Sequence, residues 1–268
     1  MLIQSKITLY CLLLFISSTV FSETIELKLG LVRSGGQQYF VELLKQSLEA
    51  KGHDVSINII GSLPQKRIIR MLEDNELSLT WLLQSKERDK RYIPLELGIT
   101  NGLIGNRVLL IPKGQNSVYA KVQNLEQFRA LDKVGVFGSG WFDVDIWKFN
   151  QLKFIAKKRG WQKKVYNQIA EGSRGVDYFS RGVFEIVDEA KGHPYLDIEP
   201  HLLLIYDRDF RFYLSQSASH YKGLLVEALT EAKQNGLMTR LIREQWAESF
   251  NALNLEDRVQ ILLKTPPQ

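Results

Sequence analysis

The chain has 268 residues, of which 44% are hydrophobic and 24% charged, and its formal net charge is +5. This balance is typical of a folded protein with a sizeable core and excludes a disordered or low-complexity chain. The basic residues are spread along the chain, Cys11 is the single cysteine, and the four histidines show no ligand spacing. We therefore expect no nucleic-acid binding, no disulfide framework, and neither a metal nor another cofactor.

Residues 1–22 have the features of a secretory signal peptide. Lys6 gives this segment a positive charge, residues 7–16 are almost all apolar, and small polar residues follow. We expect cleavage near Ser22, which would remove Cys11 and leave a thiol-free protein in the periplasm, an oxidising compartment. The alternative is a membrane anchor, but the apolar stretch is shorter than the about 20 residues that span a bilayer.

After this leader, the hydrophobic periodicity predicts strands that alternate with helices. The strands are expected at 25–32, 54–60 and 77–83, and the helices at 37–50 and 62–74. Ser62 opens the second helix in a capping-box pattern, with Pro64 in the first turn. The β-α-β-α-β order predicts a parallel sheet with right-handed crossovers.

A second, smaller α/β unit is predicted in the middle of the chain. It comprises strands at 103–111, 133–137 and 176–180 and helices at 125–131, 143–149, 161–171 and 183–190, with Asn124 as a helix cap. The segments 202–206 and 210–214 then offer a path back to the first unit. Two amphipathic helices follow, at 221–232 and, after Gly236, at 237–250. We therefore expect an α/β fold.

Two stretches resemble the type II periplasmic solute-binding proteins of the amino-acid-receptor kind, family 3. Residues 76–88 are similar to the family's strand that ends in Thr or Ser, two variable residues and Arg, and residues 212–246 are similar to its C-terminal signature. Asn124-Leu125 and Gly138 resemble the entry to its second domain. The stretches 102–107, 140–143 and 177–183 are similar to an uncharacterised proteobacterial subgroup.

This resemblance implies two α/β lobes that two crossing strands join, with a solute bound between them. Lobe one is expected at 23–110 plus 208–268, and lobe two at 111–207. The resemblance also implies a monomeric receptor, not an enzyme, that delivers a small-molecule solute to an inner-membrane transporter or a sensor.

Ligands of open parallel sheets bind beyond the carboxyl ends of the strands, and six candidate residues follow such ends. They are Arg88, Ser85, Trp141, Arg181, Asp143 and Arg33. In the family, the arginine that matches Arg88 grips the solute's α-carboxylate, and Ser85 would cap the helix that carries it. The alternative is that Arg88 belongs to a solvated run of charges at 86–91.

The other candidates each have a structural alternative. Trp141 either stacks on the solute or packs beneath the cleft, and Asp143 either accepts an amine or caps a helix. Arg181 either binds the solute or pairs with Glu185 or Asp177. Arg107 is expected in a crossing strand, where a role in the hinge competes with a ligand role.

Gly182 stands where amino-acid receptors of this family usually carry the acid that holds the α-ammonium group. With several arginines and no such acid, we expect an anionic, carboxylate-bearing solute. Two other functions stay open. One is an enzyme on the same fold that uses an acid such as Glu171, Glu185 or Asp143 in dehydratase-like acid–base chemistry, and the other is an interaction module that no longer binds a solute.

Overall fold

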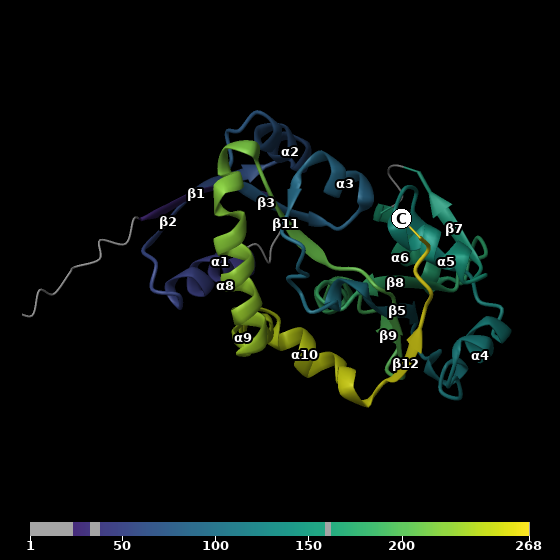
Figure 1. Cartoon of the computed structure of the whole chain (residues 1–268). Coiled ribbons are helices and arrows are strands. Elements are labelled where there is room, and N and C mark those ends of the chain that lie inside the picture. Colours follow the sequence, from purple (N-terminus) through teal and green to yellow (C-terminus); the bar gives the residue numbers. More distant parts are fainter. Residues whose placement is uncertain (1–23, 33–37, 159–161, 268) are drawn as a thin grey trace, which may run out of the picture.

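The computed structural model of the protein describes residues 24–32, 38–158 and 162–267, so the predicted signal peptide and Arg33 lie outside the described residues. The strands form two separate sheets, each with its own helices, and give the molecule two lobes (Figure 1). Within the described ranges, no helix combines the length and the apolar character that crossing a membrane requires.

The first sheet has the strand order β2-β1-β3-β11-β4. These strands are β1 (Ile25–Val32), β2 (Val55–Leu63), β3 (Leu79–Leu83), β4 (Ile93–Pro94) and β11 (Phe210–Leu214). β1 pairs in parallel with β2 and with β3, as the sequence predicts, and β11 runs antiparallel to β3. The elements α1 (Gln38–Glu49), α8 (Lys222–Gln234) and α9 (Leu237–Gln245) share one core on one face of this sheet. On the opposite face lies α2 (Gln65–Glu73), and α3 (Lys86–Arg91) follows the end of β3.

The second sheet has the order β12-β10-β5-β8-β6-β7, and β9 also pairs with β5. Its strands are β5 (Asn106–Pro112), β6 (Gly135–Gly138), β7 (Phe154–Lys157), β8 (Tyr178–Gly182), β9 (Leu196–Ile198), β10 (Leu202–Ile205) and β12 (Val259–Leu262). One face is covered by α4 (Leu125–Ala130) and α5 (Phe142–Phe149), and the other by α6 (Gln162–Ala170) and α7 (Ile186–Lys191).

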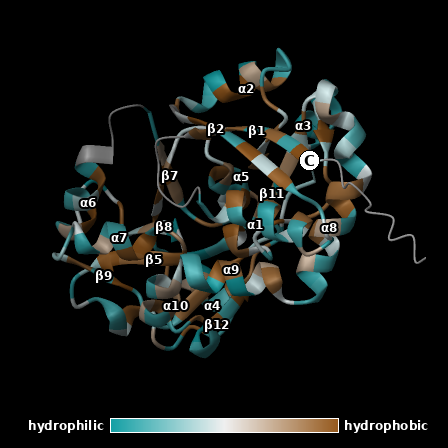
Figure 2. Ribbon diagram, turned by 90° about the vertical axis from the view of Figure 1, so that its left-hand side faces the viewer, coloured by the Kyte–Doolittle hydropathy of each residue, from teal (hydrophilic) through white to brown (hydrophobic). Residues whose placement is uncertain are grey.

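Both faces of the central strand β5 are buried, because consecutive side chains of a strand point to opposite sides. Leu109 and Ile111 pack into the core beneath α4 and α5, whereas Val108 and Leu110 pack beneath α6 and α7. An unbroken apolar run is therefore what a strand between two helix layers requires, and β5 appears as hydrophobic ribbon inside this lobe (Figure 2).

Two neighbouring segments of the chain join the lobes, residues 95–105 after β4 and residues 206–209 before β11. They touch so closely that a Cβ on Gly105 would lie 1.9 Å from the carbonyl oxygen of Tyr206. Asp209 links them by accepting hydrogen bonds from the backbone N–H groups of Thr100 and Gly102, at 2.9 and 2.8 Å. Burial raises the pKa of Asp209, against the lowering effect of these hydrogen bonds.

A third connection runs through α10 (Ala247–Leu253), because Leu253 packs in the core of the second lobe while α9 packs in that of the first. After α10 the chain forms β12, which pairs in parallel with β10. The C-terminal strand thus belongs to the second sheet, although it lies within the range 208–268 that the sequence analysis gives to lobe one.

Several elements differ from the sequence predictions. The N-cap of α2 is Pro64, which makes no side-chain capping hydrogen bond. The helix therefore does not begin at Ser62, and the capping box predicted there is wrong. The single helix predicted at 237–250 is two helices, because the backbone leaves helical geometry at Trp246. The long strand predicted at 103–111 begins with a 3-10 turn at Leu103–Gly105. β7, β9 and β12 are not predicted at all.

Candidate solute site between the lobes

A cavity of about 640 Å³ lies between the two lobes; we call it the interlobe cavity. Phe40 and Trp81 line it from the first lobe, Gly182 and Glu185 line it from the second, and Arg107 lies at the hinge. The remaining lining residues are Leu83, Leu103, Ile104, Phe184, Asp188, Glu189, Phe210, Gln245, Trp246, Glu248 and Ser249. The cavity thus follows the carboxyl ends of β3 and β8, which is where an open α/β sheet offers a binding site.

Aromatic rings form much of the wall of the interlobe cavity. Phe40 and Trp81 stack with their ring centroids 4.4 Å apart and an interplanar angle of 16°. Phe184 of the second lobe stacks on Trp246 at the end of α9, with centroids 3.9 Å apart and an angle of 17°. Such a wall suits a solute with an apolar or aromatic body.

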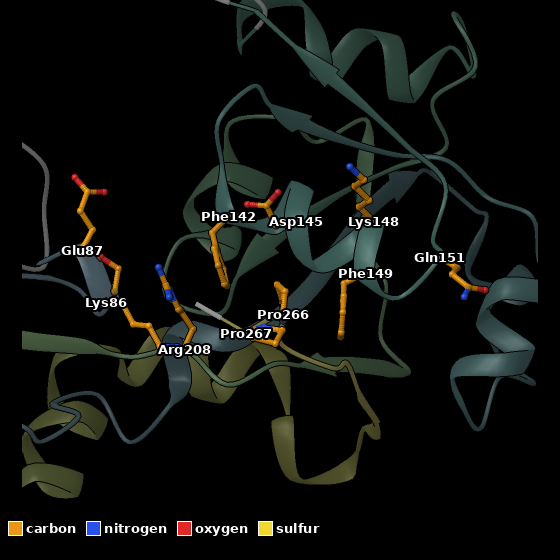
Figure 3. A pocket seen from close by; sticks show the side chains of 11 residues that line it. Lys86, Glu87, Phe142, Asp145, Lys148, Phe149, Gln151, Arg208, Pro266 and Pro267 are labelled. Atoms are coloured by element: carbon orange, nitrogen blue, oxygen red, sulfur yellow. The ribbon is translucent and has the colours of Figure 1, made fainter. Parts of the chain in front are cut away.

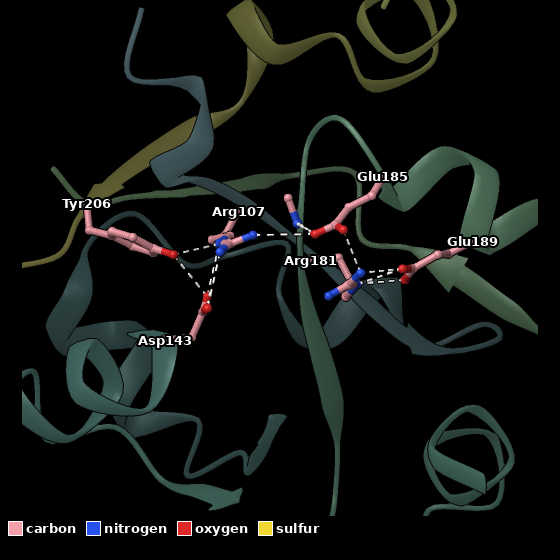
Figure 4. Close-up of polar contacts among 7 residues, drawn as sticks. Arg107, Asp143, Arg181, Glu185, Glu189 and Tyr206 are labelled. Carbon is pink, nitrogen blue, oxygen red and sulfur yellow. Dashed lines mark hydrogen bonds and ion pairs between the residues drawn. The ribbon is translucent and has the colours of Figure 1, made fainter. Parts of the chain in front are cut away.

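A buried ion pair lies at the hinge side of the cavity (Figure 4). The Nε atom of Arg107, on β5, is 3.0 Å from Oδ1 of Asp143, on α5, and it donates a hydrogen bond to the Tyr206 hydroxyl at 2.9 Å. The two side chains are only 14% and 6% exposed. Burial lowers the pKa of Arg107, but the nearby Tyr206, Asp143 and Glu185 raise it more, so that the guanidinium stays charged.

Arg181, at the end of β8, is also neutralised within the second lobe. Its guanidinium pairs with Glu189, with its Nε 2.7 Å from Oε2, and its Nη2 is 2.7 Å from Oε2 of Glu185 (Figure 4). Burial lowers the pKa of Arg181, while the two carboxylates outweigh that effect and raise it. Of the two roles considered for Arg181 in the sequence analysis, the structure therefore shows the ion pair with Glu185.

Acidic groups outnumber basic ones at the interlobe cavity. Glu185, Asp188, Glu189 and Glu248 line it, whereas Arg107 is its single basic lining residue among those described. Arg107 already faces Asp143, which lies outside the lining. The four carboxylates also have partners outside the lining, because Arg181 pairs with Glu185 and Glu189, and Lys191 pairs with Asp188 and Glu248. Counted with these partners and with Asp143, five acids face three bases, so the described part of the cavity has a small negative balance and favours a positively charged group on a solute.

Glu185 occupies the space directly in front of Gly182. The backbone N–H of Gly182 donates to Oε1 of Glu185 at 3.1 Å, and a Cβ placed on Gly182 would lie 3.1 Å from the same oxygen. The Glu185 side chain is 44% exposed. A carboxylate is therefore present at the point where the sequence analysis finds an acid missing, but it comes from three residues further along the chain.

The structure places Ser85 and Arg88 at the end of β3. Ser85 is the N-cap of α3, as predicted, and its Oγ accepts a hydrogen bond from the backbone N–H of Arg88 at 3.2 Å. The half-buried Arg88 donates from Nη1 to the carbonyl oxygen of Leu83. Neither Ser85 nor Arg88 is among the residues that line the interlobe cavity.

Trp141 and Asp143 lie at the start of α5. Trp141 is the N-cap, and its Nε1 would be 2.6 Å from a Cβ on Gly138, so the ring lies back over that glycine. The Arg181 guanidinium lies 5.1 Å above the Trp141 ring. Asp143 is in the first turn of α5 and pairs with Arg107, so the predicted role as the helix cap is not met.

The sequence does not identify Phe184 or Trp246 as lining residues of the interlobe cavity. For Tyr39 and Phe40 it leaves open a residue that stacks on the solute or a place in the helix core; both belong to the first core, and Phe40 also lines the cavity. Glu185 is already named in the sequence analysis as a possible ion-pair partner of Arg181, and the structure places it between the end of β8 and the start of α7.

Comparison with known proteins agrees on the fold. No protein-family model and no curated protein sequence matches the chain. Among solved structures, the probable amino-acid ABC transporter extracellular-binding protein ytmK from Bacillus subtilis is 13% identical, with a TM-score of 0.61 over 84% of this chain and 99% of that one. Substrate-binding domain 2 of GlnP from Lactococcus lactis, in an open conformation, is 10% identical, with a TM-score of 0.56 over 82% and 94%.

A third similar structure is a putative binding component of an ABC transporter from Wolinella succinogenes in complex with lysine, at 16% identity and a TM-score of 0.54 over 82% and 95%. At these identities the likeness concerns the fold. The chain has the two-lobed fold of the periplasmic solute-binding proteins.

Proposed function

We propose that the protein is an extracytoplasmic receptor that holds a small solute between its lobes for a transporter or a sensor. One observation carries this proposal: the interlobe cavity is lined from both lobes, at the carboxyl ends of β3 and β8, next to the crossing segments. A solute in such a place contacts two bodies that move about a hinge, so its binding is coupled to closure. The similar structures that are named as binding proteins support the same function.

The solute that we propose carries an ammonium group and an apolar or aromatic body. The ammonium group would approach Glu185, whose carboxylate lies in front of Gly182 and is partly exposed. The body would lie among Phe40, Trp81 and Trp246. A cation next to these rings gains from their negative faces as well as from the acidic balance of the lining.

We also propose that the solute carries the carboxylate that the sequence analysis expects. Arg88 would receive it from the end of β3 once its guanidinium turns from the carbonyl oxygen of Leu83 toward the interlobe cavity, which it does not line in this structure. An amino compound with a carboxylate at one end and an apolar side chain would then use both lobes. An amine without a carboxylate would use the second lobe and the aromatic wall.

A thermal-shift screen of the exported protein tests this proposal with matched probes. Phenylalanine, phenylethylamine and phenylpropionate share one ring and differ in which charged groups they carry. A bound probe adds stability by mass action, about 2.7 kcal/mol of unfolding free energy at a hundredfold excess over Kd. We expect phenylethylamine, which carries an ammonium group and no carboxylate, to stabilise the protein, and we expect this stabilisation to depend on Glu185.

Two matched variants locate the binding. Glu185→Gln should abolish the stabilisation, because the amide carries no charge to pair with the ammonium group. Glu244→Gln is the control, since Glu244 forms an exposed i, i+4 pair with Arg240 on α9. Stabilisation by phenylpropionate alone, or an unchanged response in Glu185→Gln, would contradict the proposed solute class.

A further inference from the structure

A second cavity between the lobes lies on the side of α3 and α5, and none of its lining residues is shared with the interlobe cavity. We call it the α3–α5 cavity; its volume is about 690 Å³ (Figure 3). Ser85, Lys86 and Glu87 line it from the start of α3, and α5 lines it from the second lobe. Arg208 of the crossing segment and the C-terminal Pro266 and Pro267 complete it.

Arg208 is a buried cation without a counter-ion. The residue is 5% exposed, and its Nε and Nη1 atoms are buried without a hydrogen-bond partner. Its guanidinium carbon lies 3.8 Å from the centroid of the Phe142 ring, which is a contact with a ring face and satisfies no N–H group. Among the described residues, no carboxylate forms an ion pair with Arg208, although the charge of Asp207, its neighbour in the chain, acts to raise its pKa. Buried guanidinium groups are ordinarily paired, because an unpaired buried charge is unfavourable.

The charges around Arg208 do not compensate for it. Lys86 and Lys148 line the same cavity, against Glu87 and Asp145, so the five charged lining residues have an excess of one positive charge. Arg88 stands close enough to disfavour the charged form of Arg208. Burial first, and then this neighbouring guanidinium, lower the pKa of Arg208. This excess of basic side chains around Arg208 therefore favours binding of an anion.

The rest of the α3–α5 cavity is apolar. Phe142 and Phe149 project from α5, and Pro266 and Pro267 lie between the two rings in the view of Figure 3. Phe149 is 47% exposed, which is unusual for so large an apolar side chain. A bare inorganic ion would leave these rings in water, whereas an organic anion would cover them.

We propose that the α3–α5 cavity is a second ligand site, which binds a small organic carboxylate with an apolar body through Arg208. The carboxylate accepts hydrogen bonds from the guanidinium of Arg208, and the body packs against Phe142, Phe149 and the two prolines. Because α3 and α5 belong to different lobes, a ligand here contacts both lobes beside the hinge. Occupancy of the site therefore changes the balance between open and closed forms, and through it the affinity of the interlobe cavity.

Calorimetric titration of the exported protein with sodium benzoate tests this site. Benzylamine and inorganic phosphate are the comparison probes, because the first keeps the ring without the anion and the second keeps the anion without the ring. We expect benzoate to bind, and benzylamine and phosphate not to displace it. Arg208→Gln should weaken benzoate binding by at least about tenfold, as expected for losing hydrogen bonds to a charged group.

The matched control is Arg243→Gln, which removes an arginine whose side chain is 64% exposed and which pairs with Glu256 away from both cavities. Circular dichroism establishes that the variants are folded. If Arg208→Gln does not fold, Lys86→Gln serves in its place, since Lys86 is exposed, and it should weaken benzoate binding about threefold as one screened charge is lost. Trp81→Leu separates the two sites, because Trp81 lines the interlobe cavity and not the α3–α5 cavity, so benzoate bound in the interlobe cavity would lose a ring that it packs against.

Three results would overturn the proposal. They are no benzoate binding to the unaltered protein, equal binding to the Arg208 variant, and displacement of benzoate by phosphate with equal strength. Loss of benzoate binding in Trp81→Leu would also contradict it, since the probe would then occupy the interlobe cavity. None of these outcomes depends on whether an amino compound binds at Glu185.

Discussion

Phe184 of the second lobe and Trp246 at the end of α9 stack face to face, with centroids 3.9 Å apart. This contact joins the lobes at one wall of the interlobe cavity. It also lies at the point where the predicted single helix breaks into α9 and α10. The stack therefore stabilises the contact between the lobes, and its removal should favour the open form.

We expect Phe184→Ala to shift the protein without solute toward an open form. Aromatic pairs contribute about 0.5–1.5 kcal/mol beyond their buried area, which corresponds to about a two- to tenfold change in the ratio of closed to open molecules. Small-angle scattering should record a larger radius of gyration for this variant. Phe149→Ala is the control, because Phe149 lies outside the interlobe cavity and is 47% exposed. Identical scattering from both variants would mean that the stack does not hold the lobes together.

Arg88→Ala should weaken binding of a carboxylate-bearing solute by about 30-fold or more, as expected for losing a charge-assisted pair. Arg88→Lys should recover little, because an ammonium group cannot reproduce the planar fork. Calorimetric titration of the three proteins measures this. Affinities equal within about twofold would limit Arg88 to its hydrogen bond with the carbonyl oxygen of Leu83.

Asp143→Asn should lower the free energy of unfolding by about 3 kcal/mol, because it leaves the buried Arg107 without its closest counter-ion. Urea unfolding monitored by circular dichroism gives this value. Asp132→Asn is the comparison, since Asp132 pairs with Lys153 at the surface and should contribute less than about 1 kcal/mol. Similar losses in the two variants would argue against a structural role for the Arg107–Asp143 pair.

Asp209 should make the stability of the hinge depend on pH. Its pKa in the folded protein is raised above the ordinary 3.8, mainly by burial. The folded state therefore holds this proton more tightly than the unfolded state, and its stabilising effect is present at low pH and lost as the pH rises through the folded pKa.

Unfolding free energies across this pH range, for the unaltered protein and for Asp209→Asn, measure the effect. Relative to the variant, the unaltered protein should lose stability as the pH rises from about 4, because only its side chain becomes charged in the buried site. A constant difference between the two proteins over the range would show that the pKa of Asp209 is not shifted by folding.

Much of the fold could be predicted from the sequence because it rests on local periodicity. The alternating pattern of β1 and the apolar stripe of α1 are readable without any partner, and both elements appear within a residue or two of their expected bounds. β7, β9 and β12 have three or four residues each and exist through pairing with distant strands. Segments that short carry little periodic signal. β10 is equally short, but it could be predicted because its four residues are all apolar.

At the candidate site, too, the features that depend on neighbouring residues could be predicted, whereas those that depend on distant residues could not. The role of Ser85 as a helix cap can be predicted because capping depends on neighbours in the chain, and the ion pair of Arg181 can be considered because its possible partners Glu185 and Asp177 lie close to it in sequence. The Arg107–Asp143 pair joins residues 36 apart in sequence, and Arg208 is distinguished by the partner that it lacks. Both features depend on three-dimensional packing, which no local pattern in the chain contains.

The C-terminal strand β12 gives the two lobes a third covalent tie beside the crossing segments. Two neighbouring connections would let one lobe twist as well as bend relative to the other. The third connection, through α10, restrains the twist. The motion left to the molecule is close to bending about a single axis. It also follows that residues 107–206, expressed alone, would lack a strand of their sheet, so this lobe cannot be produced as a contiguous fragment with a complete sheet.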